Sequence, residues 1–428
     1  MTGLAAARAA GATVYEAAAG PGGICSSYYV RPGVPGRLAA APTDGEAYRF
    51  EIGGGHWIFG GDPAVLDFVN RRTPLRRHTR RSSVRLGPTA PLVPYPIQNH
   101  LHALDPEVAR QCLLEIEQAA TLPHTEGAGT MLAAFEQSFG PTLAELFFVP
   151  FNHRYTAGLA GQVAPQDGYK SPVDLDAVRR GVRADTPGGG YNATFAYPDG
   201  GLDRLAASMA ADVDVRYGSA VVGIDTTARV LQLDDGTEVP YGALISTVPL
   251  HRAVELAGVD LDEPPDPHTS VLVVNIGAER GDACPDDHWV YDAGSLAGFH
   301  RVGFYDNVDR GFLPASDRAA GDRVSLYVER AYAGATPPTP AELQAAIDAT
   351  VAELQDRRWI GRTEAVDPTW IDVAYTWARP GSTWRARALD ELAAVGVSQV
   401  GRYGRWVFQG IADSIRDGFV VGSALRPR

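Results

Sequence analysis

The sequence predicts an α/β protein in which two domains interleave along the chain. Three observations predict this class: a helix–strand–acid pattern at the start that is typical of dinucleotide-binding units, alternating strand patterns between about residues 268 and 332, and short β segments that return to the first unit after long insertions. With 428 residues, the chain is long enough for two domains or for one large interleaved domain.

The first 23 residues carry the dinucleotide-binding pattern. Gly3 opens a helix of small residues over 4–10, and a β-branched run then leads to the acid Glu16. In a complete Rossmann-like unit, a strand and a G-x-G-x-x-G turn bring the pyrophosphate to the helix N-terminus, and the acid binds the ribose hydroxyls. Gly3 fits only the last of those glycines, and Glu16 follows it sooner than the roughly 20 residues that are usual. A folded chain that starts at Met1 is therefore expected to bind its nucleotide weakly or not at all.

A second glycine-rich stretch follows residues 48–52, where alternating side-chain character predicts a half-buried strand. Gly53, Gly54 and Gly55 lead directly to His56. Such a run indicates a backbone that lies against something flat or charged. A tight turn between the strand and a helix over 62–72 is the alternative.

Seven arginines lie between residues 71 and 85. Such a cluster usually forms a solvated face, although guanidinium groups could also meet a polyanionic substrate. An extended segment over 92–99 follows, because its two prolines exclude a helix.

The remaining chain divides into a helical block and a mixed block. Helical periodicity runs from about 104 to 148, with further helices predicted over about 128–140 and 141–148. Predicted strands cover 213–217, 220–225, 230–233, 243–247, 270–276, 289–291, 299–304, 324–329, 371–377 and 397–400, and predicted helices cover about 201–211, 340–356 and the segment from 410.

Composition narrows the function classes. The net charge of −13 argues against general nucleic-acid binding, and no apolar run is long enough to span a membrane. Three dispersed cysteines form neither a disulfide framework nor a metal pattern, so no metal is expected and a reducing cytoplasm is the default location. Lys170 is the only lysine, which leaves one candidate for any lysine-dependent chemistry.

Several motifs, taken in order, resemble one superfamily. They are VYE at 14–16, PGGICSS at 21–27, IGGGHW at 52–57, VPYPIQN at 93–99, PFN at 150–152, FAYP at 195–198 followed by Gly200 and Gly201, LISTVPL at 244–250, and GRYG at 401–404. Together they resemble the flavoproteins that include UDP-galactopyranose mutase, protoporphyrinogen oxidase and the flavin amine oxidases. The similarity is strongest to the mutase-like, protoporphyrinogen oxidase-related branch. The order and spacing indicate the superfamily, not one reaction.

The resemblance implies an extended FAD and a division of the chain. Residues 1–85, 190–250 and 395–428 would form a discontinuous FAD-binding domain, 86–189 a helical insertion, and 251–394 a substrate domain of antiparallel sheet with helices. Residues implied to contact FAD are Gly3, Glu16, Gly22, Gly23, Ser26, Gly54, Gly55, His56, Val222 (or Val221), Gly401, Arg402, Gln409, Gly410, Ile411 and Ala412.

The resemblance leaves the reaction open. Amine oxidases of the superfamily place a lysine near the flavin. Lys170, the only lysine, is expected in a loop or helical region rather than on the substrate sheet, which argues against an amine oxidase. A mutase needs arginines for the diphosphate of its nucleotide-sugar. The candidates are Arg154, Arg301, Arg330 and Arg379, with Tyr155, Tyr305, Tyr327 and Tyr332 as hydroxyl donors.

Oxidation of a small sugar-like or natural-product substrate is the third enzymatic reading, with His56 or His300 as a possible base. Across these readings the catalytic candidates are His56, Arg154, Tyr155 and Arg301. The non-enzymatic alternative is a relic or accessory protein that no longer binds FAD tightly.

Overall fold

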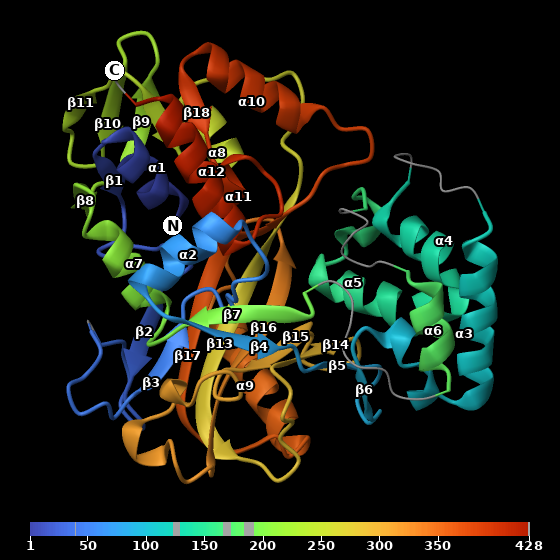
Figure 1. The fold of residues 1–428 in the computed structure, drawn as a ribbon. Helices are drawn as coiled ribbons and strands as arrows, with labels where there is room; N and C mark the ends of the chain where they lie inside the picture. Colours follow the sequence, from blue (N-terminus) through green and yellow to red (C-terminus); the bar gives the residue numbers. More distant parts are fainter. Residues whose placement is uncertain (39, 123–128, 166–172, 184–191, 427–428) are drawn as a thin grey trace.

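The structure, a computed structural model, describes residues 1–38, 40–122, 129–165, 173–183 and 192–426 (Figure 1). The first unit and the C-terminal helices lie together at one end, a long sheet runs below them, and a helical block stands to one side. Among the described residues, no helix is long and apolar enough to cross a membrane.

The first unit is assembled from segments that lie far apart in the sequence. Helix α1 (Thr2–Ala10) ends at Gly11, whose φ of 70° is the left-handed conformation that glycine tolerates. Strand β1 (Val14–Glu16) pairs in parallel with β8 (Val215–Tyr217), and β12 (Leu244–Ser246) pairs in parallel with β18 (Val397–Gln399). The return of distant segments confirms the predicted interleaved α/β class.

Helix α12 (Ile411–Ala424) packs closely along α1 (Figure 1). Gly418 and Gly422 make this approach possible, because a Cβ atom at either position would run into the backbone carbonyl oxygens of Thr2 and Ala6. The predicted last helix is confirmed, and it begins one residue later than expected.

Smaller sheets and helices complete this end of the molecule. Strand β2 (Ser27–Val30) pairs with β3 (Tyr48–Glu51), and β4 (Leu75–Thr79) pairs with β7 (Thr194–Pro198). The predicted alternation of β3 is wrong, because all four of its residues are buried, Glu51 completely. The other elements are β9 (Val221–Asp225), β10 (Val230–Leu233), β11 (Glu238–Pro240), α2 (Pro63–Arg72), α7 (Leu202–Ala210), α8 (Leu250–Leu256), α10 (Trp384–Ala394) and α11 (Gly401–Gly404).

A seven-stranded sheet of order β17-β13-β16-β15-β14-β5-β6 forms the second layer. Its strands are β17 (Ile360–Thr376), β13 (His268–Arg280), β16 (Arg323–Ala333), β15 (Arg301–Phe304), β14 (Trp289–Asp292), β5 (Ser82–Arg85) and β6 (Leu92–Pro94). Strand β17 starts well before the predicted residue 371. The expected domain boundary between residues 85 and 86 falls between β5 and β6, inside this sheet.

Both faces of the sheet are covered, which explains why β13 is buried over almost its whole length. Val273 contributes to the core shared with the first unit, whereas its neighbours Leu272 and Val274 belong to the core under helix α9 (Pro340–Asp356). Helix α9 has the predicted bounds and begins with a capping box formed by Thr339 and Glu342.

The helical insertion contains α3 (Pro106–Ala119), α4 (Met131–Leu143), a π-helical turn (Ala144–Phe148), α5 (Val149–Tyr155) and α6 (Leu175–Gly181). The predicted helix end at Phe148 is wrong, because the chain stays helical through Pro150. Proline is tolerated there in the first turn of α5. Helix α5 directs the aromatic rings of Phe151 and Tyr155 toward the sheet, where they contact Tyr291 and His300.

Candidate functional site

A cavity of about 910 Å³ is lined by residues of the first unit, the seven-stranded sheet and the helical insertion. Two helix starts face it, with Gly3 of α1 and Gly410 and Ile411 of α12 among the lining residues. The first N–H groups of a helix have no partner within the helix, and they carry its positive dipole end. This end of the cavity therefore suits an anion.

Glu16 lies at the carboxyl end of the parallel strand β1 and lines the same part of the cavity. Its Oε1 accepts a hydrogen bond from the backbone N–H of Ala18 at 2.9 Å. The structure therefore brings Glu16 to the α1 N-terminus, where a ribose-binding acid is expected.

The PGG turn also lines the cavity through Gly22 and Gly23. Gly22 has a φ of 105°, and a Cβ atom there would lie 2.7 Å from the carbonyl oxygen of Cys25. Ser26 is not among the lining residues, and its carbonyl oxygen instead accepts the N–H of Ile52 at 2.9 Å. The turn thus presents backbone rather than the predicted serine hydroxyl.

The glycine loop after β3 presents Gly55 and His56 to the cavity. A Cβ atom at Gly55 would collide with the hydroxyl of Tyr327, so this backbone must be bare. Burial, reinforced by the positive charge of Arg402, lowers the pKa of His56 to about 4. His56 is therefore uncharged at neutral pH and a weak base. Gly54 faces the sheet instead and does not line the cavity.

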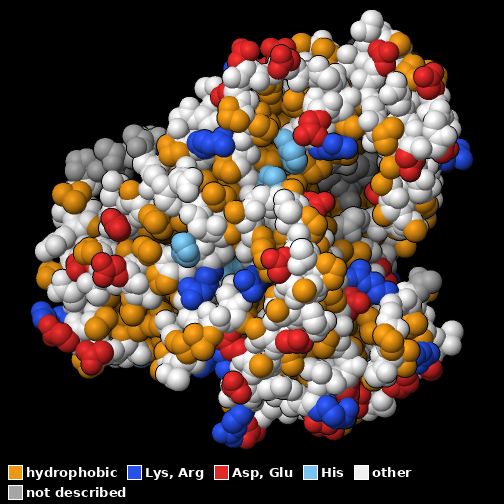
Figure 2. Space-filling view, turned by 180° about the vertical axis from the view of Figure 1, so that it is seen from behind, with side chains coloured by type: hydrophobic (Ala, Val, Ile, Leu, Met, Phe, Trp, Pro, Cys, Tyr) orange, Lys and Arg blue, Asp and Glu red, His pale blue; other side chains and the backbone are white. Residues whose placement is uncertain are grey.

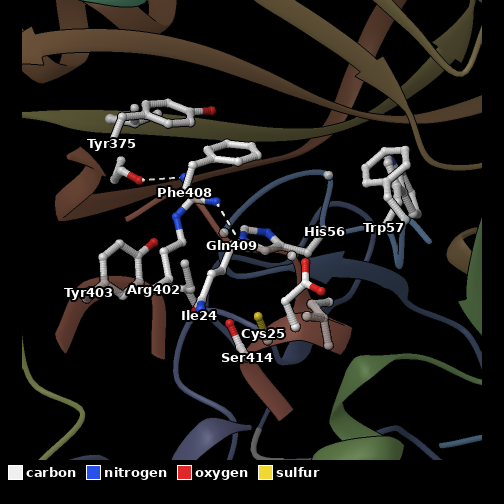
Figure 3. Close-up of a pocket in the computed structure, with 18 of the residues that line it drawn as sticks. Ile24, Cys25, His56, Trp57, Tyr375, Arg402, Tyr403, Phe408, Gln409 and Ser414 are labelled. Atoms are coloured by element: carbon white, nitrogen blue, oxygen red, sulfur yellow. Dashed lines mark hydrogen bonds between the residues drawn. The ribbon is translucent and has the colours of Figure 1, made fainter. Parts of the chain in front are cut away.

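The segment from Gly401 to Ile411 also contributes to the cavity wall, and Figure 3 shows Arg402 and Gln409 of this segment close to His56. Arg402 donates hydrogen bonds to the carbonyl oxygens of Gln409 at 3.4 Å and Ala374 at 3.1 Å. Within the part of the chain that the structure describes, Nε of Arg402 and Oε1 of Gln409 are buried without a hydrogen-bond partner. Two lining residues therefore hold unused polar atoms.

The far end of the cavity is aromatic. The rings of Phe139 and Phe148 stack with centroids 4.2 Å apart, and that of Tyr155 lies 4.5 Å from that of Tyr375. The aromatic residues that line this end are Tyr95, Phe135, Phe139, Phe147, Phe148, Phe151, Tyr155, Tyr291 and Tyr375.

One charged cluster interrupts this aromatic surface. Arg301 on β15 and Glu329 on β16 lie opposite each other in the strand register and form an ion pair. Burial alone would raise the pKa of Glu329, but Arg301 and His300 outweigh it and hold the pKa at about 2. Arg301 also donates to the hydroxyl of Tyr375 at 3.0 Å. Sequence reasoning identified Arg301 and missed Glu329 and Tyr375.

Several predicted residues are not brought to the cavity. Arg154 donates to the carbonyl oxygens of Pro150 at 3.1 Å and Ser295 at 3.3 Å. Val222 is 52% exposed on β9, and Ala412 is buried in the core rather than at the cavity wall. Strand β9, which carries Val222, belongs to the three-stranded sheet β11-β10-β9, and Val222 does not line the cavity.

The predicted basic cluster does not form one surface. Arg80 lines the cavity, whereas Arg72 pairs with Asp212 and Arg76 with Asp199. On the face shown in Figure 2, basic side chains lie among acidic ones. Lys170 lies outside the described residues. Within the described ranges, no group of three potential ligands could hold a metal ion.

Comparisons with solved structures extend over nearly the whole chain. A reduced UDP-galactopyranose mutase matches with a TM-score of 0.80 at 21% identity, covering 99% of this chain and 92% of the other. A protein from Exiguobacterium sp. 255-15, provisionally named protoporphyrinogen oxidase, gives 0.67 at 16%, covering 99% and 95%. Wild-type putrescine oxidase bound to putrescine gives 0.57 at 15%, covering 99% and 96%. At these identities the matches show a shared fold.

A search of curated proteins finds no match. The family model of flavin-containing amine oxidoreductases, in contrast, matches residues 1–271, which is more than half of the chain. The chain therefore belongs to the flavin-containing amine oxidoreductase family.

Proposed function

We propose that this protein is an FAD-dependent oxidoreductase that acts on a small, largely apolar molecule. The observation that carries the proposal is the continuity of the cavity. Its lining extends from the helix starts and Glu16, past Gly55 and His56, to the aromatic wall of the helical insertion. One end suits a nucleotide cofactor, and the other suits an apolar substrate.

The lining residues fit FAD in three respects. The starts of α1 and α12 would hold the pyrophosphate, and Glu16 would bind the ribose hydroxyls. The backbone of Gly55, which packs against Tyr327 and lines the cavity, would lie beside a flat ring. The unpartnered polar atoms of Arg402 and Gln409 would meet the polar edge of that ring. These features support a cofactor-binding protein over the relic alternative.

Bound FAD would supply a hydride acceptor. The chain's own contribution is to position the substrate and exclude water, for which the aromatic wall is suited. His56 is a weak base because its pKa lies at about 4, so packing against the cofactor is its better-supported role.

The arginines favour an oxidoreductase over a nucleotide-sugar mutase. Of the four arginines proposed for diphosphate binding, Arg301 lines the cavity and is paired with Glu329. Arg154 is held by backbone carbonyls, Arg379 pairs with Asp266, and Arg330 lies over the ring of Tyr332. Of the four tyrosines, Tyr155 is the one that lines the cavity. These four candidate arginines thus do not converge on the cavity as the ligands of a diphosphate would.

FAD titration of the purified protein tests the proposal. We expect a bound flavin absorption band, tighter binding of FAD than of FMN because only FAD has the adenosine ribose, and a weakened preference in Glu16→Gln. Anaerobic bleaching of the band by apolar substrates would support the oxidoreductase assignment, whereas isomerisation of UDP-galactose by the dithionite-reduced protein would contradict it. A protein that binds neither flavin would contradict the proposal.

A further inference from the structure

Glu329 offers the cavity one carboxylate oxygen that is not engaged by the protein. Its Oε2 accepts Nε–H of Arg301 at 3.1 Å and the hydroxyl of Tyr375 at 3.3 Å, and Nε2 of His300 lies 3.3 Å from the same atom. Among the residues that the structure describes, no donor reaches Oε1. Because Glu329 lines the cavity, a bound molecule meets a hydrogen-bond acceptor here.

The charges around this acceptor do not favour a cation. Arg301 on β15 and Arg402 on α11 both act on Tyr375, the residue that bonds to Glu329. Burial lowers the pKa of His300 and of His56, so both rings are uncharged at neutral pH. The negative charge of Glu329 is thus already balanced by the guanidinium of Arg301, with that of Arg402 nearby on the other side of Tyr375, so an ammonium group at Oε1 would find little uncompensated negative charge.

Apolar rings stand next to the acceptor. The ring of Tyr155 lies 5.3 Å from that of His300, and Phe151 lies 5.7 Å from Tyr155. A molecule whose polar group reaches Glu329 would thus place its remaining atoms against the aromatic wall. A single donor group on an apolar body fits this arrangement.

We propose that the cavity binds a neutral, apolar molecule through a hydroxyl group that donates a hydrogen bond to Oε1 of Glu329, and that it selects against ammonium compounds. This inference rests on the proposed function, which makes the cavity a substrate site, and it names the chemical class of that substrate. It separates this chain from an oxidase of protonated amines.

Three probes of nearly equal size test the inference on the FAD-loaded protein. They are 2-phenylethanol, its methyl ether, which lacks the donor, and 2-phenylethylammonium. Dissociation constants can be measured by ligand-observed NMR and by perturbation of the flavin spectrum. We expect the alcohol to bind about tenfold more tightly than the ether, because a hydrogen bond to a charged acceptor is lost, and more tightly than the ammonium compound.

Glu329→Gln identifies the acceptor. Since Arg301 donates to the Oε2 position, the amide oxygen would occupy that position and the NH₂ group would face the cavity. The preference for the alcohol over the ether should then disappear. Asp306→Asn is the matched control, because Asp306 is a buried carboxylate of the same sheet region that does not line the cavity, and it should keep the wild-type ranking.

The outcomes separate this inference from the proposed function. A protein that binds FAD but does not distinguish alcohol from ether, or that binds the ammonium compound most tightly, contradicts the inference alone. Retained alcohol preference in Glu329→Gln also contradicts it. If that variant does not fold, the wild-type ranking still decides. Failure to bind FAD contradicts the proposed function instead.

Discussion

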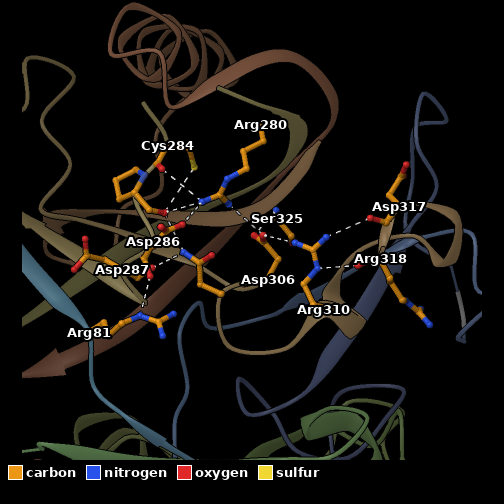
Figure 4. A network of polar contacts seen from close by, with 12 residues as sticks. Arg81, Arg280, Cys284, Asp286, Asp287, Asp306, Arg310, Asp317, Arg318 and Ser325 are labelled. Carbon is orange, nitrogen blue, oxygen red and sulfur yellow. Dashed lines mark hydrogen bonds and ion pairs between the residues drawn. The ribbon is translucent and has the colours of Figure 1, made fainter. Parts of the chain in front are cut away.

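Two buried arginine–carboxylate clusters, one around Asp306 and one around Glu329, differ in how many carboxylate oxygens are bonded within the protein. At Asp306, Oδ1 accepts the backbone N–H of Ser325 at 3.0 Å, and Oδ2 lies 3.4 Å from Nη1 of Arg280 and 3.7 Å from that of Arg310 (Figure 4). At Glu329, in contrast, the protein contacts converge on Oε2. Both side chains are almost completely buried, so burial of charge does not by itself mark a binding site.

The two carboxylates also titrate in opposite directions. Burial raises the pKa of Asp306, and its arginines do not overcome that effect. The closer pairing with Arg301 holds the pKa of Glu329 at about 2. The comparison teaches that a binding site is marked by a buried, ionised carboxylate that keeps one oxygen free to accept a hydrogen bond from a molecule in the cavity. A carboxylate whose two oxygens are both bonded within the protein has only a structural role.

The largest expected effect comes from removing the cation of the cavity cluster. Arg301→Met would leave Glu329 ionised, buried and without its main partner, so we expect the free energy of unfolding to fall by about 3–5 kcal/mol. Urea unfolding measures this loss. Arg301→Met/Glu329→Gln should recover much of it, and Arg280→Met should lose less, about 1–3 kcal/mol, because Asp306 keeps the N–H of Ser325 and Arg310. Equal losses of stability in Arg301→Met and Arg280→Met would show that the two carboxylates depend equally on their arginines, contrary to this expectation.

Acid should affect the clusters with opposite signs. The pKa of Glu329 is lowered from 4.5 to about 2, so its stabilising contribution is present above pH 4.5 and is lost as the pH falls toward 2; its full size is about 3 kcal/mol. The pKa of Asp306 is raised, so its protonation on acidification favours the folded state.

Unfolding free energies between pH 7 and pH 3 measure these contributions. Glu329→Gln should flatten the acid side of the profile, and Asp306→Asn should steepen it. Parallel profiles for the two variants would show that the carboxylates are equivalent.

A smaller effect is expected at Tyr375, whose hydroxyl joins Arg301 and Glu329. Tyr375→Phe removes these bonds and keeps the ring, so stability should fall by about 1–2 kcal/mol. The same variant should weaken the preference for the alcohol probe only slightly, because Oε1 of Glu329 is untouched. Differential scanning calorimetry and the probe titration give both values, and a complete loss of the preference would place the acceptor elsewhere.

The smallest effect is expected at Ser325 in the closed cluster. Its backbone N–H holds Asp306, but its hydroxyl is buried without a partner among the described residues. Ser325→Ala should therefore change the free energy of unfolding by less than about 0.5 kcal/mol or increase it slightly. A loss above 1 kcal/mol in urea unfolding would indicate a hydrogen bond that the structure does not contain.

Local patterns predicted the elements of the fold well. Helix α9 and the strands of the parallel pairs follow from capping signals and β-branched runs, as do Gly3 and Glu16 at the cavity. Patterns within a few residues carry this information, because caps and turns act over that range.

The polar part of the site could not be predicted in the same way. Glu329 meets Arg301 through strand register, and Tyr375 joins from β17, so their proximity is a tertiary property. Arg154 and Tyr155 are adjacent in sequence, but neighbours on a helix point about 100° apart, and only Tyr155 faces the cavity. The PFN motif that precedes both residues therefore does not distinguish Tyr155, which lines the cavity, from Arg154, which does not.

The close packing of α1 against α12 also has a consequence for biosynthesis. The floor of the cavity combines Gly3 near the start with Gly410 and Ile411 near the end, and Gly418 and Gly422 dock the two helices. During translation, more than 400 residues must leave the ribosome before this floor can close. Residues 2–10 must wait for that partner, and we expect chaperones to protect the nascent chain in the interval.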